Sequence, residues 1–375
     1  MLNIGVDGRN LIVRPTGIGR YILESCKSLI EMGHRLHLYF PSQPHSYEIL
    51  PAGAHVHVSG SNNSISRIIW GLSKVGRLAG NDRVDVFWGP AHRLPLRYFT
   101  AMPTVLTIHD LVWLVASDTM RARNYYAEKA LMLPAVRSAT RIVSVSESTR
   151  NDIIKFFPDM AYKVDQVYPG WTNTLADADS TQGPSALPST RYGLFVGTLE
   201  PRKNLLNLLA AYALLPEELR LQNVLIIAGG QGWRMPDLKK EISRLHLSDC
   251  VQLRGYVTDK ELGELYKHAR FVAMPSKFEG FGLPIIEANS FGVPVITSNR
   301  SSMPEVVGAA GLIVDPDNVE SIRHALLNIM VDDDLHSYLC GKAKENISRF
   351  DWKKCAEGLT EVFERAILQG NPPVR

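Results

Sequence analysis

The sequence predicts an α/β protein built from two open parallel sheets that are each flanked by helices. Short apolar runs alternate with longer segments of helical periodicity along the 375 residues, which is typical of parallel strands joined by crossover helices. The alternation stops once, at residues 171–190, in a segment rich in Ser, Thr, Asp, Pro and Gly that has no apolar period; this composition indicates a linker. A chain of this length commonly forms two domains. We therefore expect domains at 1–170 and 191–350, followed by a last helix within 351–375.

Each half of the chain contains six predicted strands, bounded by turn residues and rich in β-branched and aromatic side chains. In the first half they are Leu2–Val6, Leu36–Phe40, His55–Val58, Val84–Trp88, Thr104–Ile108 and Arg141–Val145. In the second half they are Tyr192–Val196, Val224–Ala228, Val251–Leu253, Phe271–Met274, Val293–Thr297 and Leu312–Val314.

Segments with helical periodicity lie between these strands. The predicted helices are Gly19–Met32, Ser66–Leu78, Arg121–Ser138, Ser146–Phe156, Lys203–Leu214, Met235–Leu245, Asp259–Ala269, Pro284–Phe291, Val319–Val331 and Asp351–Leu368. Two parallel sheets joined by a linker form a cleft, and ligands are expected there, at the carboxyl ends of the strands.

Composition excludes several classes of protein. Lys and Arg total 41 against 38 Asp and Glu, a net charge of +3, which is too small for a nucleic-acid-binding protein. The four cysteines form no CxxC pair, so neither a zinc site nor a disulfide framework is expected and a reducing cytosol is favoured. The start of the chain lacks the apolar stretch of a signal peptide, and the longest apolar run, Leu205–Leu215, is too short to span a bilayer. We expect a cytoplasmic protein, either soluble or peripheral at the inner face of the membrane.

Two features of the first half follow predicted strands. Gly17, Gly19 and Arg20 lead into a helix, where free N–H groups and the helix dipole favour an anion and Arg20 could pair with a phosphate or carboxylate. An ordinary glycine turn at a helix start is the alternative.

His109 comes directly after the buried strand Thr104–Ile108, where a histidine would titrate near neutral pH and serve hydrogen bonding or proton transfer. A structural histidine is its alternative.

In the second half, Arg202 and Lys203 lie between a strand and a predicted helix. Two cations at a helix start oppose the helix dipole, so their position is explained if an anion lies there, with Lys203 on a phosphate and Arg202 as a second donor. A solvated charged turn is the alternative.

Two glutamates eight residues apart form the most informative pattern. Pro284 suits the first turn of a helix, which places Glu279 in the preceding loop and Glu287 within the helix. On a single helix they would be about 12 Å apart, too far for the roughly 5 Å pair of a retaining hydrolase. A loop acid could instead bind sugar hydroxyls, while Glu287 could accept hydrogen bonds from a ribose diol. The backbone amides that would face a phosphate belong to the residues between them, Gly280, Phe281, Gly282 and Leu283.

These motifs together resemble glycosyltransferase family 4, whose members have the GT-B architecture. The resemblance rests on EGFGLPIIE at 279–287, which is similar to the family's E-x7-E signature, on GTLEPRKN at 197–204, GIGRY at 17–21, the His109-Asp110 pair, VSVSEST at 143–149 and FDW at 350–352. It covers nearly the whole chain, with the motifs in the family's order.

The resemblance implies an enzyme that takes a sugar from a nucleotide-sugar with retention of anomeric configuration. Lys203 matches the lysine on the diphosphate, Glu279 the acid on the donor sugar hydroxyls and Glu287 the acid on the ribose. His109 matches the histidine near the reacting sugar, and Gly17 to Gly19 the loop under the phosphates. The family's last helix crosses back to the N-terminal domain.

The resemblance also implies that no metal and no cofactor take part, the nucleotide-sugar being a substrate. Many members carry an arginine where this chain has Thr198, so Arg202 is the nearest substitute for the second phosphate cation. No residue is an obvious nucleophile, which favours same-face attack over a covalent intermediate.

The GTLEPRKN variant resembles bacterial O-antigen mannosyltransferases, so we expect GDP-mannose as donor and a glycan or lipid-linked glycan as acceptor in cell-surface polysaccharide synthesis. The segment 121–126 mixes basic and aromatic residues that suit a lipid-phosphate surface, with an ordinary amphipathic helix face as its alternative. An epimerase or hydrolase of nucleotide-sugars and a catalytically silent nucleotide-binding scaffold are the competing interpretations.

Overall fold

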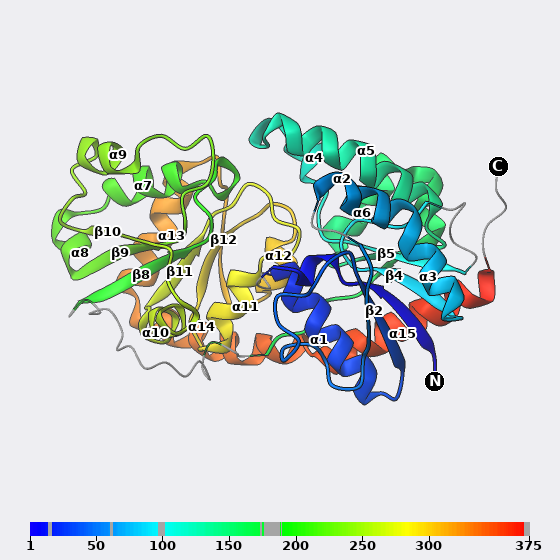
Figure 1. Ribbon diagram of the computed structural model, residues 1–375. Coiled ribbons are helices and arrows are strands. Elements are labelled where there is room, and N and C mark those ends of the chain that lie inside the picture. The colour runs from blue at the N-terminus through cyan, green and yellow to red at the C-terminus, as the bar shows by residue number, and fades with distance from the viewer. Residues whose placement is uncertain are drawn as a thin grey trace. The chain divides into compact units, whose positions relative to one another are not determined.

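The computed structural model describes residues 1–13, 17–60, 63–96, 102–172, 175, 188 and 190–370. It divides into two compact units. The N-terminal unit comprises Met1–Val115, Ala122–Gly170 and Phe350–Arg375, and the C-terminal unit comprises Ala116–Arg121 and Trp171–Arg349. Each is built on a parallel sheet of its own, as Figure 1 shows. The predicted linker, 171–190, falls almost entirely outside the described residues.

The N-terminal unit contains a seven-stranded parallel sheet with the order β3-β2-β1-β4-β5-β6-β7. The strand order reverses between β1 and β4, which are hydrogen-bonded neighbours although two strands and several helices separate them in sequence. The strands are β1 (Asn3–Asp7), β2 (Arg35–Phe40), β3 (His55–Val58), β4 (Val86–Gly89), β5 (Thr104–Ile108), β6 (Arg141–Ser144) and β7 (Val164–Gln166).

The helices of this unit cover its sheet, whose central strands are almost wholly apolar and buried on both faces. They are α1 (Gly17–Glu31), α2 (Ser64–Ile69), α3 (Val75–Asn81), α4 (Val112–Val115), α5 (Ala122–Ser138), α6 (Glu147–Phe156) and α15 (Trp352–Gln369). A π-helical turn, Trp70–Lys74, joins α2 to α3, so the single predicted helix 66–78 is divided into three parts.

The C-terminal helix α15 is part of the N-terminal core. Its apolar side chains recur at helical spacing and are buried in one cluster with α1 and the sheet, and α15 runs beside α1 in Figure 1. Asp351 caps the helix by accepting hydrogen bonds from the N–H groups of Lys353 and Lys354. A Cβ added at Gly170 would lie 2.3 Å from the backbone nitrogen of Trp352, so the chain passes closely beside the start of α15.

The C-terminal unit contains a six-stranded parallel sheet with the order β10-β9-β8-β11-β12-β13. The strands are β8 (Arg191–Val196), β9 (Asn223–Ala228), β10 (Val251–Gly255), β11 (Phe271–Met274), β12 (Val295–Ser298) and β13 (Gly311–Val314). The helices are α7 (Leu205–Ala213), α8 (Glu217–Gln222), α9 (Leu238–Arg244), α10 (Asp259–His268), α11 (Leu283–Ser290), α12 (Met303–Val307), α13 (Val319–Val331) and α14 (Asp333–Asn346).

The predicted α/β class with two parallel sheets is confirmed. The sequence reasoning missed β7 and the helices α4, α8, α12 and α14. Among the described residues, no helix is both long and apolar enough to cross a membrane. All four cysteines are free thiols.

Candidate functional site

The topology of the C-terminal unit brings two loops together. The strand order reverses between β8 and β11, which pair directly with Gly193 opposite Phe271. In an open parallel sheet, ligands bind outside the carboxyl ends of the strands at such a reversal. The loop after β8 carries Arg202 and Lys203, and the loop after β11 carries Glu279.

The loop after β8 places Lys203 over a glycine. Gly197 has φ of +140°, and a Cβ added there would lie 3.4 Å from the Cε of Lys203. Lys203 ends a 3-10 turn, Pro201–Lys203, and Asn204 follows in the left-handed conformation before α7 begins at Leu205. The prediction that Lys203 starts a helix is therefore wrong, because the left-handed Asn204 separates the turn from α7.

A second glycine turn, after β9, packs against the first. A Cβ added at Gly229 would lie 1.9 Å from the carbonyl oxygen of Gly197. Backbone hydrogen bonds tie the two turns together, from Gly197 N–H to the carbonyl of Ala228 and from Leu199 N–H to the carbonyl of Gly230. The position of the loop that carries Lys203 thus depends on the absence of a side chain at Gly229.

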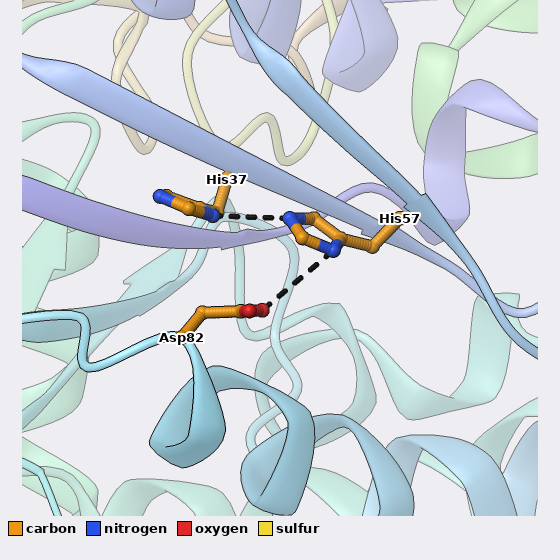
Figure 2. Close-up of side chains that lie close together, drawn as sticks. All are labelled: His37, His57 and Asp82. Atoms are coloured by element: carbon orange, nitrogen blue, oxygen red, sulfur yellow. Dashed lines mark hydrogen bonds and ion pairs between the residues drawn. The ribbon is translucent and has the colours of Figure 1, made fainter.

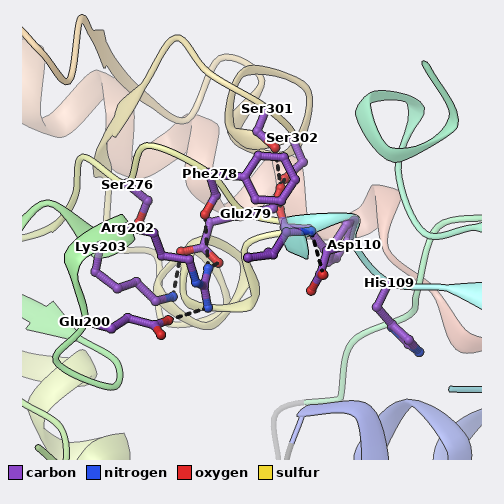
Figure 3. A network of polar contacts seen from close by, with 12 residues as sticks. His109, Asp110, Glu200, Arg202, Lys203, Ser276, Phe278, Glu279, Ser301 and Ser302 are labelled. Atoms are coloured by element: carbon purple, nitrogen blue, oxygen red, sulfur yellow. Dashed lines mark hydrogen bonds and ion pairs between the residues drawn. The ribbon is translucent and has the colours of Figure 1, made fainter. Parts of the chain in front are cut away.

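Lys203 and Arg202 converge on the carboxylate of Glu279 (Figure 3). The Nζ of Lys203 lies 2.6 Å from one carboxylate oxygen, and the Nη1 of Arg202 lies 2.5 Å from the other. Arg202 also pairs with Glu200 at 2.6 Å and donates to the carbonyl of Phe278 at 3.0 Å. Lys203, Glu200 and Glu279 are buried, so two cations and two acids share a largely dehydrated site.

The charges of this cluster set the ionisation of its acids. Burial alone would raise the pKa of Glu279, but the charges of Lys203 and Arg202 and their hydrogen bonds outweigh it and lower the pKa to about 2. For Glu200, burial dominates and raises the pKa, while Arg202 and Lys203 oppose the rise. Glu279 is therefore a carboxylate at neutral pH, able to accept hydrogen bonds but not to donate a proton.

Among the residues that the structure describes, two buried polar atoms beside the Lys203–Glu279 ion pair have no hydrogen-bond partner. They are the Oε2 of Glu200 and the Oγ of Ser276. An unsatisfied buried polar atom costs free energy unless a ligand or water completes it, so both mark a place where a polar ligand would be accommodated.

Serines that follow β12 hold the loop of Glu279. The Oγ of Ser302 lies 2.9 Å from the carbonyl oxygen of Glu279 and 2.8 Å from that of Phe281, and the Oγ of Ser301 also donates to the carbonyl of Glu279. Sequence reasoning missed these serines and Glu200. The serines could have been found from their position shortly after a strand, and Glu200 from its place within GTLEPRKN.

The helix that follows this loop matches the expectation from Pro284. Gly282 has φ of +102° and caps α11, and Pro284 lies in its first turn. Gly280, Phe281 and Gly282 therefore complete the loop, and Leu283 is the first residue of α11.

Glu287 lies in the interior of α11, as predicted, and is buried. Its Oε2 accepts a hydrogen bond of 2.6 Å from the hydroxyl of Tyr266, a fully buried residue of α10 whose ring stacks on Phe291. This contact fixes the orientation of the Glu287 carboxylate. Tyr266 is a further residue that sequence reasoning missed, since nothing in its local pattern distinguishes it from a core tyrosine.

His109, in the N-terminal unit, directly follows β5 as predicted. Its Nε2 lies 2.7 Å from the carbonyl oxygen of Pro90, and its backbone N–H donates to the Nε2 of His92 at 2.8 Å. The ring of Tyr21 on α1 meets the His109 ring edge to face, with centroids 5.0 Å apart. Because a carbonyl only accepts, the Nε2 of His109 carries the proton and its Nδ1 holds the lone pair.

The expectation that His109 titrates near neutral pH is wrong. Burial lowers its pKa to about 3, His92 contributes to the lowering, and the hydrogen bond to Pro90 opposes it only in part. His109 is a neutral imidazole at physiological pH, which suits it to hydrogen bonding and not to donating a proton.

The predicted glycine turn of the N-terminal unit is already helical. Gly17 is the first residue of α1, Gly19 is buried, and Arg20 lies in the same turn; residues 14–16, which precede them, lie outside the described residues. The first turn of an α-helix is in general a place where backbone N–H groups can bind an anion, and Gly17 to Arg20 occupy that turn in α1.

The acidic run Asp332–Asp334 has a structural role. Asp332 caps α14 by accepting from the N–H of Leu335, and Asp333 pairs with Arg270 at 2.5 Å. The run therefore forms the start of α14.

Two family models match the chain in succession. The model described as "Glycosyltransferase Family 4" matches residues 15–171, and the model described as "Glycosyl transferases group 1" matches residues 183–346.

Relatives of known name are similar over most of the chain. "O-antigen chain mannosyltransferase B" of Escherichia coli is 36% identical over 288 residues, which are 74% of this chain and 74% of the relative. "Serotype-specific mannosyltransferase WbdA" of Escherichia coli is 28% identical over 294 residues, 74% of this chain but only 34% of WbdA. Among solved structures, Anabaena Alr3699/HepE in complex with UDP has a TM-score of 0.73 and 18% identity, covering 97% of this chain and 100% of that one. The last comparison concerns the fold alone.

Proposed function

The chain belongs to glycosyltransferase family 4, and we propose that it is a retaining, metal-independent enzyme that transfers mannose from GDP-mannose. The acceptor would be a glycan or lipid-linked glycan of a cell-surface polysaccharide, reached at the cytoplasmic face of the membrane. The names of the two mannosyltransferase relatives support the choice of sugar and of pathway. The two cations paired with Glu279 support a reaction in which a nucleoside diphosphate leaves.

The observation that carries the proposal is that Lys203 and Arg202 meet Glu279 at the carboxyl ends of β8 and β11. An ammonium group has three N–H donors, so Lys203 can hold Glu279 with one and a donor phosphate with another. As the bond to the sugar breaks, negative charge develops on the departing diphosphate, and a fixed cation in a dehydrated site stabilises that charge. Arg202 would add a second donor in place of the family arginine that Thr198 replaces.

The ionised state of Glu279 supports a role in holding the sugar. Its carboxylate, with a pKa of about 2, accepts hydrogen bonds from sugar hydroxyls over the whole physiological range. Two cations engage its oxygens, which lowers its reactivity as a nucleophile. We therefore assign Glu279 to the sugar hydroxyls and Glu287, oriented by Tyr266, to the ribose diol. Gly280 to Leu283 would contribute backbone N–H groups to the phosphates.

The N-terminal residues take smaller parts in the proposal. His109 would act as a neutral hydrogen-bond acceptor near the reacting sugar. Its Nε2–H donates to the carbonyl of Pro90, so the contact would be made through the lone pair on Nδ1. The first turn of α1, with Gly17, Gly19 and Arg20, would bind phosphate through backbone N–H groups.

Purified protein and a panel of nucleotide-sugars test the proposal in two steps. GDP-mannose should raise the melting temperature, and UDP-glucose should not, because a ligand that binds only the folded state stabilises it. GDP-mannose should then be consumed rapidly only when a mannose-terminated acceptor is present, with or without a chelator.

Three outcomes would contradict the proposal. Rapid consumption of donor without acceptor would indicate the epimerase or hydrolase. If GDP-mannose binds but is not consumed with any acceptor offered, the protein would be the catalytically silent nucleotide-binding scaffold. A strict requirement for added divalent metal would remove the metal-independent mechanism.

A further inference from the structure

Three side chains of the N-terminal unit lie close together outside the residues assigned to the reaction. They are His37 on β2, His57 on the edge strand β3, and Asp82 directly after α3 (Figure 2). One nitrogen of each imidazole and one carboxylate oxygen all lie within 4.8 Å of one another. The Nδ1 of His37 is 3.0 Å from the Nε2 of His57, and the Nδ1 of His57 is 3.6 Å from the Oδ2 of Asp82.

The sheet register explains why the two histidines meet. In the pairing of β2 with β3, His37 lies opposite His55 and Tyr39 lies opposite His57. Residues two apart on a strand share a face, so all four rings lie on the same face of these two strands. The ring planes of His37 and His57 are only 21° apart. Each imidazole thus presents a nitrogen toward the other, a position set by the sheet.

The carboxylate of Asp82 lies at a helix end where a positive charge would stabilise it. It is the C-terminal cap of α3, at the end of the helix where the dipole disfavours negative charge. The hydroxyl of Tyr39 donates to its Oδ2 at 2.7 Å, which positions the carboxylate but does not neutralise it. The side chain of Asp82 is 30% exposed and that of His57 is 31% exposed, so an ion can reach both from solvent.

We propose that His37, His57 and Asp82 form a binding site for a divalent transition-metal ion such as Zn²⁺. Two imidazole nitrogens and one carboxylate oxygen are a donor set that suits zinc, and three protein ligands leave a fourth position for water. Ligands at about 2.1 Å from a tetrahedral ion lie about 3.4 Å from one another. One ligand atom from each of the three residues lies within 4.8 Å of the other two, so side-chain rotations would have to bring the farthest pair closer by up to about 1.4 Å. Mg²⁺ is disfavoured because it prefers oxygen ligands.

The site would have a structural effect. Its ligands come from three elements that are separate in the sequence: β2, the edge strand β3 and the end of α3. The pairing of β2 with β3 and the hydrogen bond from Tyr39 to Asp82 already connect these elements. A bound ion would tie all three elements together and stabilise the folded N-terminal unit, since it binds a site that the unfolded chain does not hold in place. This metal site takes no part in the proposed transfer reaction.

The test uses the full chain, freed of any affinity tag and of metal, titrated with ZnCl₂ alone. Calorimetry should give one strong site per chain, and zinc at about 100 times its dissociation constant should raise the melting temperature by about 5–10 °C. MgCl₂ should leave the melting temperature unchanged. Co²⁺ in place of zinc should give the intense visible absorption of a four-coordinate site.

Two variants and one matched control assign the ligands. His57→Ala and Asp82→Asn should each weaken zinc binding by at least about 10–100-fold, the loss seen when even an outer-shell partner of a metal site is removed. Asp82→Asn keeps the shape of the side chain, so it serves if His57→Ala folds poorly. His324→Ala, which removes an exposed histidine paired with Glu320 in the C-terminal unit, should bind zinc like the unmodified chain.

Two results would overturn the proposal. One is the absence of a strong zinc site in the unmodified chain. The other is zinc binding that His57→Ala and Asp82→Asn leave unchanged, which would show adventitious binding by other surface groups.

Discussion

At the scale of single residues, the central feature is a buried carboxylate held by two cations. Glu279 contacts Lys203 and Arg202 at 2.6 and 2.5 Å. A buried ion pair of this kind is not an efficient source of stability, because desolvating the charges costs about as much as their attraction returns. The pairing is more readily explained by chemistry, since it presents an ionised acid and two cations to a sugar diphosphate.

Glu279→Gln should therefore lower turnover in a chain that still folds. Loss of one contact that acts on the transition state costs roughly 100-fold or more in kcat. Leaving Lys203 and Arg202 without this partner should lower the free energy of unfolding by about 3–5 kcal/mol. Steady-state transfer and urea unfolding measure both effects. Glu241→Gln, at an exposed pair with Arg244, is the control and should leave transfer unchanged; near-normal transfer by folded Glu279→Gln would remove Glu279 from the site.

The buried, neutral His109 should make stability depend on pH. Its pKa is about 3 in the folded chain against an ordinary 6.5, so between these values the unfolded chain binds the additional proton. The free energy of unfolding should then fall as pH falls from 6.5 toward 3, by at most about 1.4 kcal/mol per pH unit from this group, and its contribution should be constant above 6.5.

His109→Gln removes that contribution. Urea unfolding of the two proteins at several values between pH 7.5 and pH 4.5 should show a difference in stability that changes as the pH is lowered. Parallel stability curves for the two proteins would contradict the assignment of a low pKa to His109.

The local structure around the candidate acids could be predicted from sequence, whereas the ionisation of the candidate residues could not. The spacing of Glu279 and Glu287 and the position of Pro284 placed one acid in a loop and one in a helix, as the structure has them. The low pKa of His109 depends on burial and on Pro90 and His92, which only the tertiary fold brings together. The same holds for the serines that fix the loop of Glu279.

At the scale of elements, strands were predicted well because each has a strong apolar signal of its own. The predicted His55–Val58, Thr104–Ile108 and Phe271–Met274 match β3, β5 and β11 residue for residue. The missed β7 has only three residues and a single apolar side chain, Val164. The missed helix α14 begins with two acids, Asp333 and Asp334, and Asp332 is its N-terminal cap. Three successive acids carry no apolar period, so the sequence did not indicate a separate helix there.

The contact between the two glycine turns gives a test at this scale. Gly229→Ala should force the turn after β9 away from Gly197, because its Cβ would lie 1.9 Å from a carbonyl oxygen and its φ is +157°. We expect a lower melting temperature and a higher KM for the donor, since the loop that carries Lys203 is hydrogen-bonded to this turn.

Gly230→Ala is the matched control for that variant. No atom of the described residues lies within 4 Å of a Cβ added at Gly230. The melting temperature and KM of this variant should therefore stay close to those of the unmodified chain. Equal effects of the two substitutions would show that the close approach at Gly229 does not set the loop's position.

At the scale of the whole molecule, both units repeat one topology. Each sheet reverses its strand order beside its first strand, at β1–β4 and at β8–β11. In the C-terminal unit the loops at this reversal carry the Lys203–Arg202–Glu279 cluster, in accord with the rule that such reversals bind ligands. The strand order could not be read from periodicity, because hydrophobic patterns specify which segments are strands but not their neighbours. The last helix, α15, packs in the N-terminal core, and only the family resemblance predicted this.

The reaction proposed for this family 4 chain is the transfer of mannose with retention of configuration. The most direct measurement is the anomeric configuration of the new linkage, determined by NMR of the product formed from GDP-α-mannose and a mannose-terminated acceptor. Same-face attack, in a site to which no nucleophile is assigned, should give an α-mannoside. A β-mannoside would contradict it.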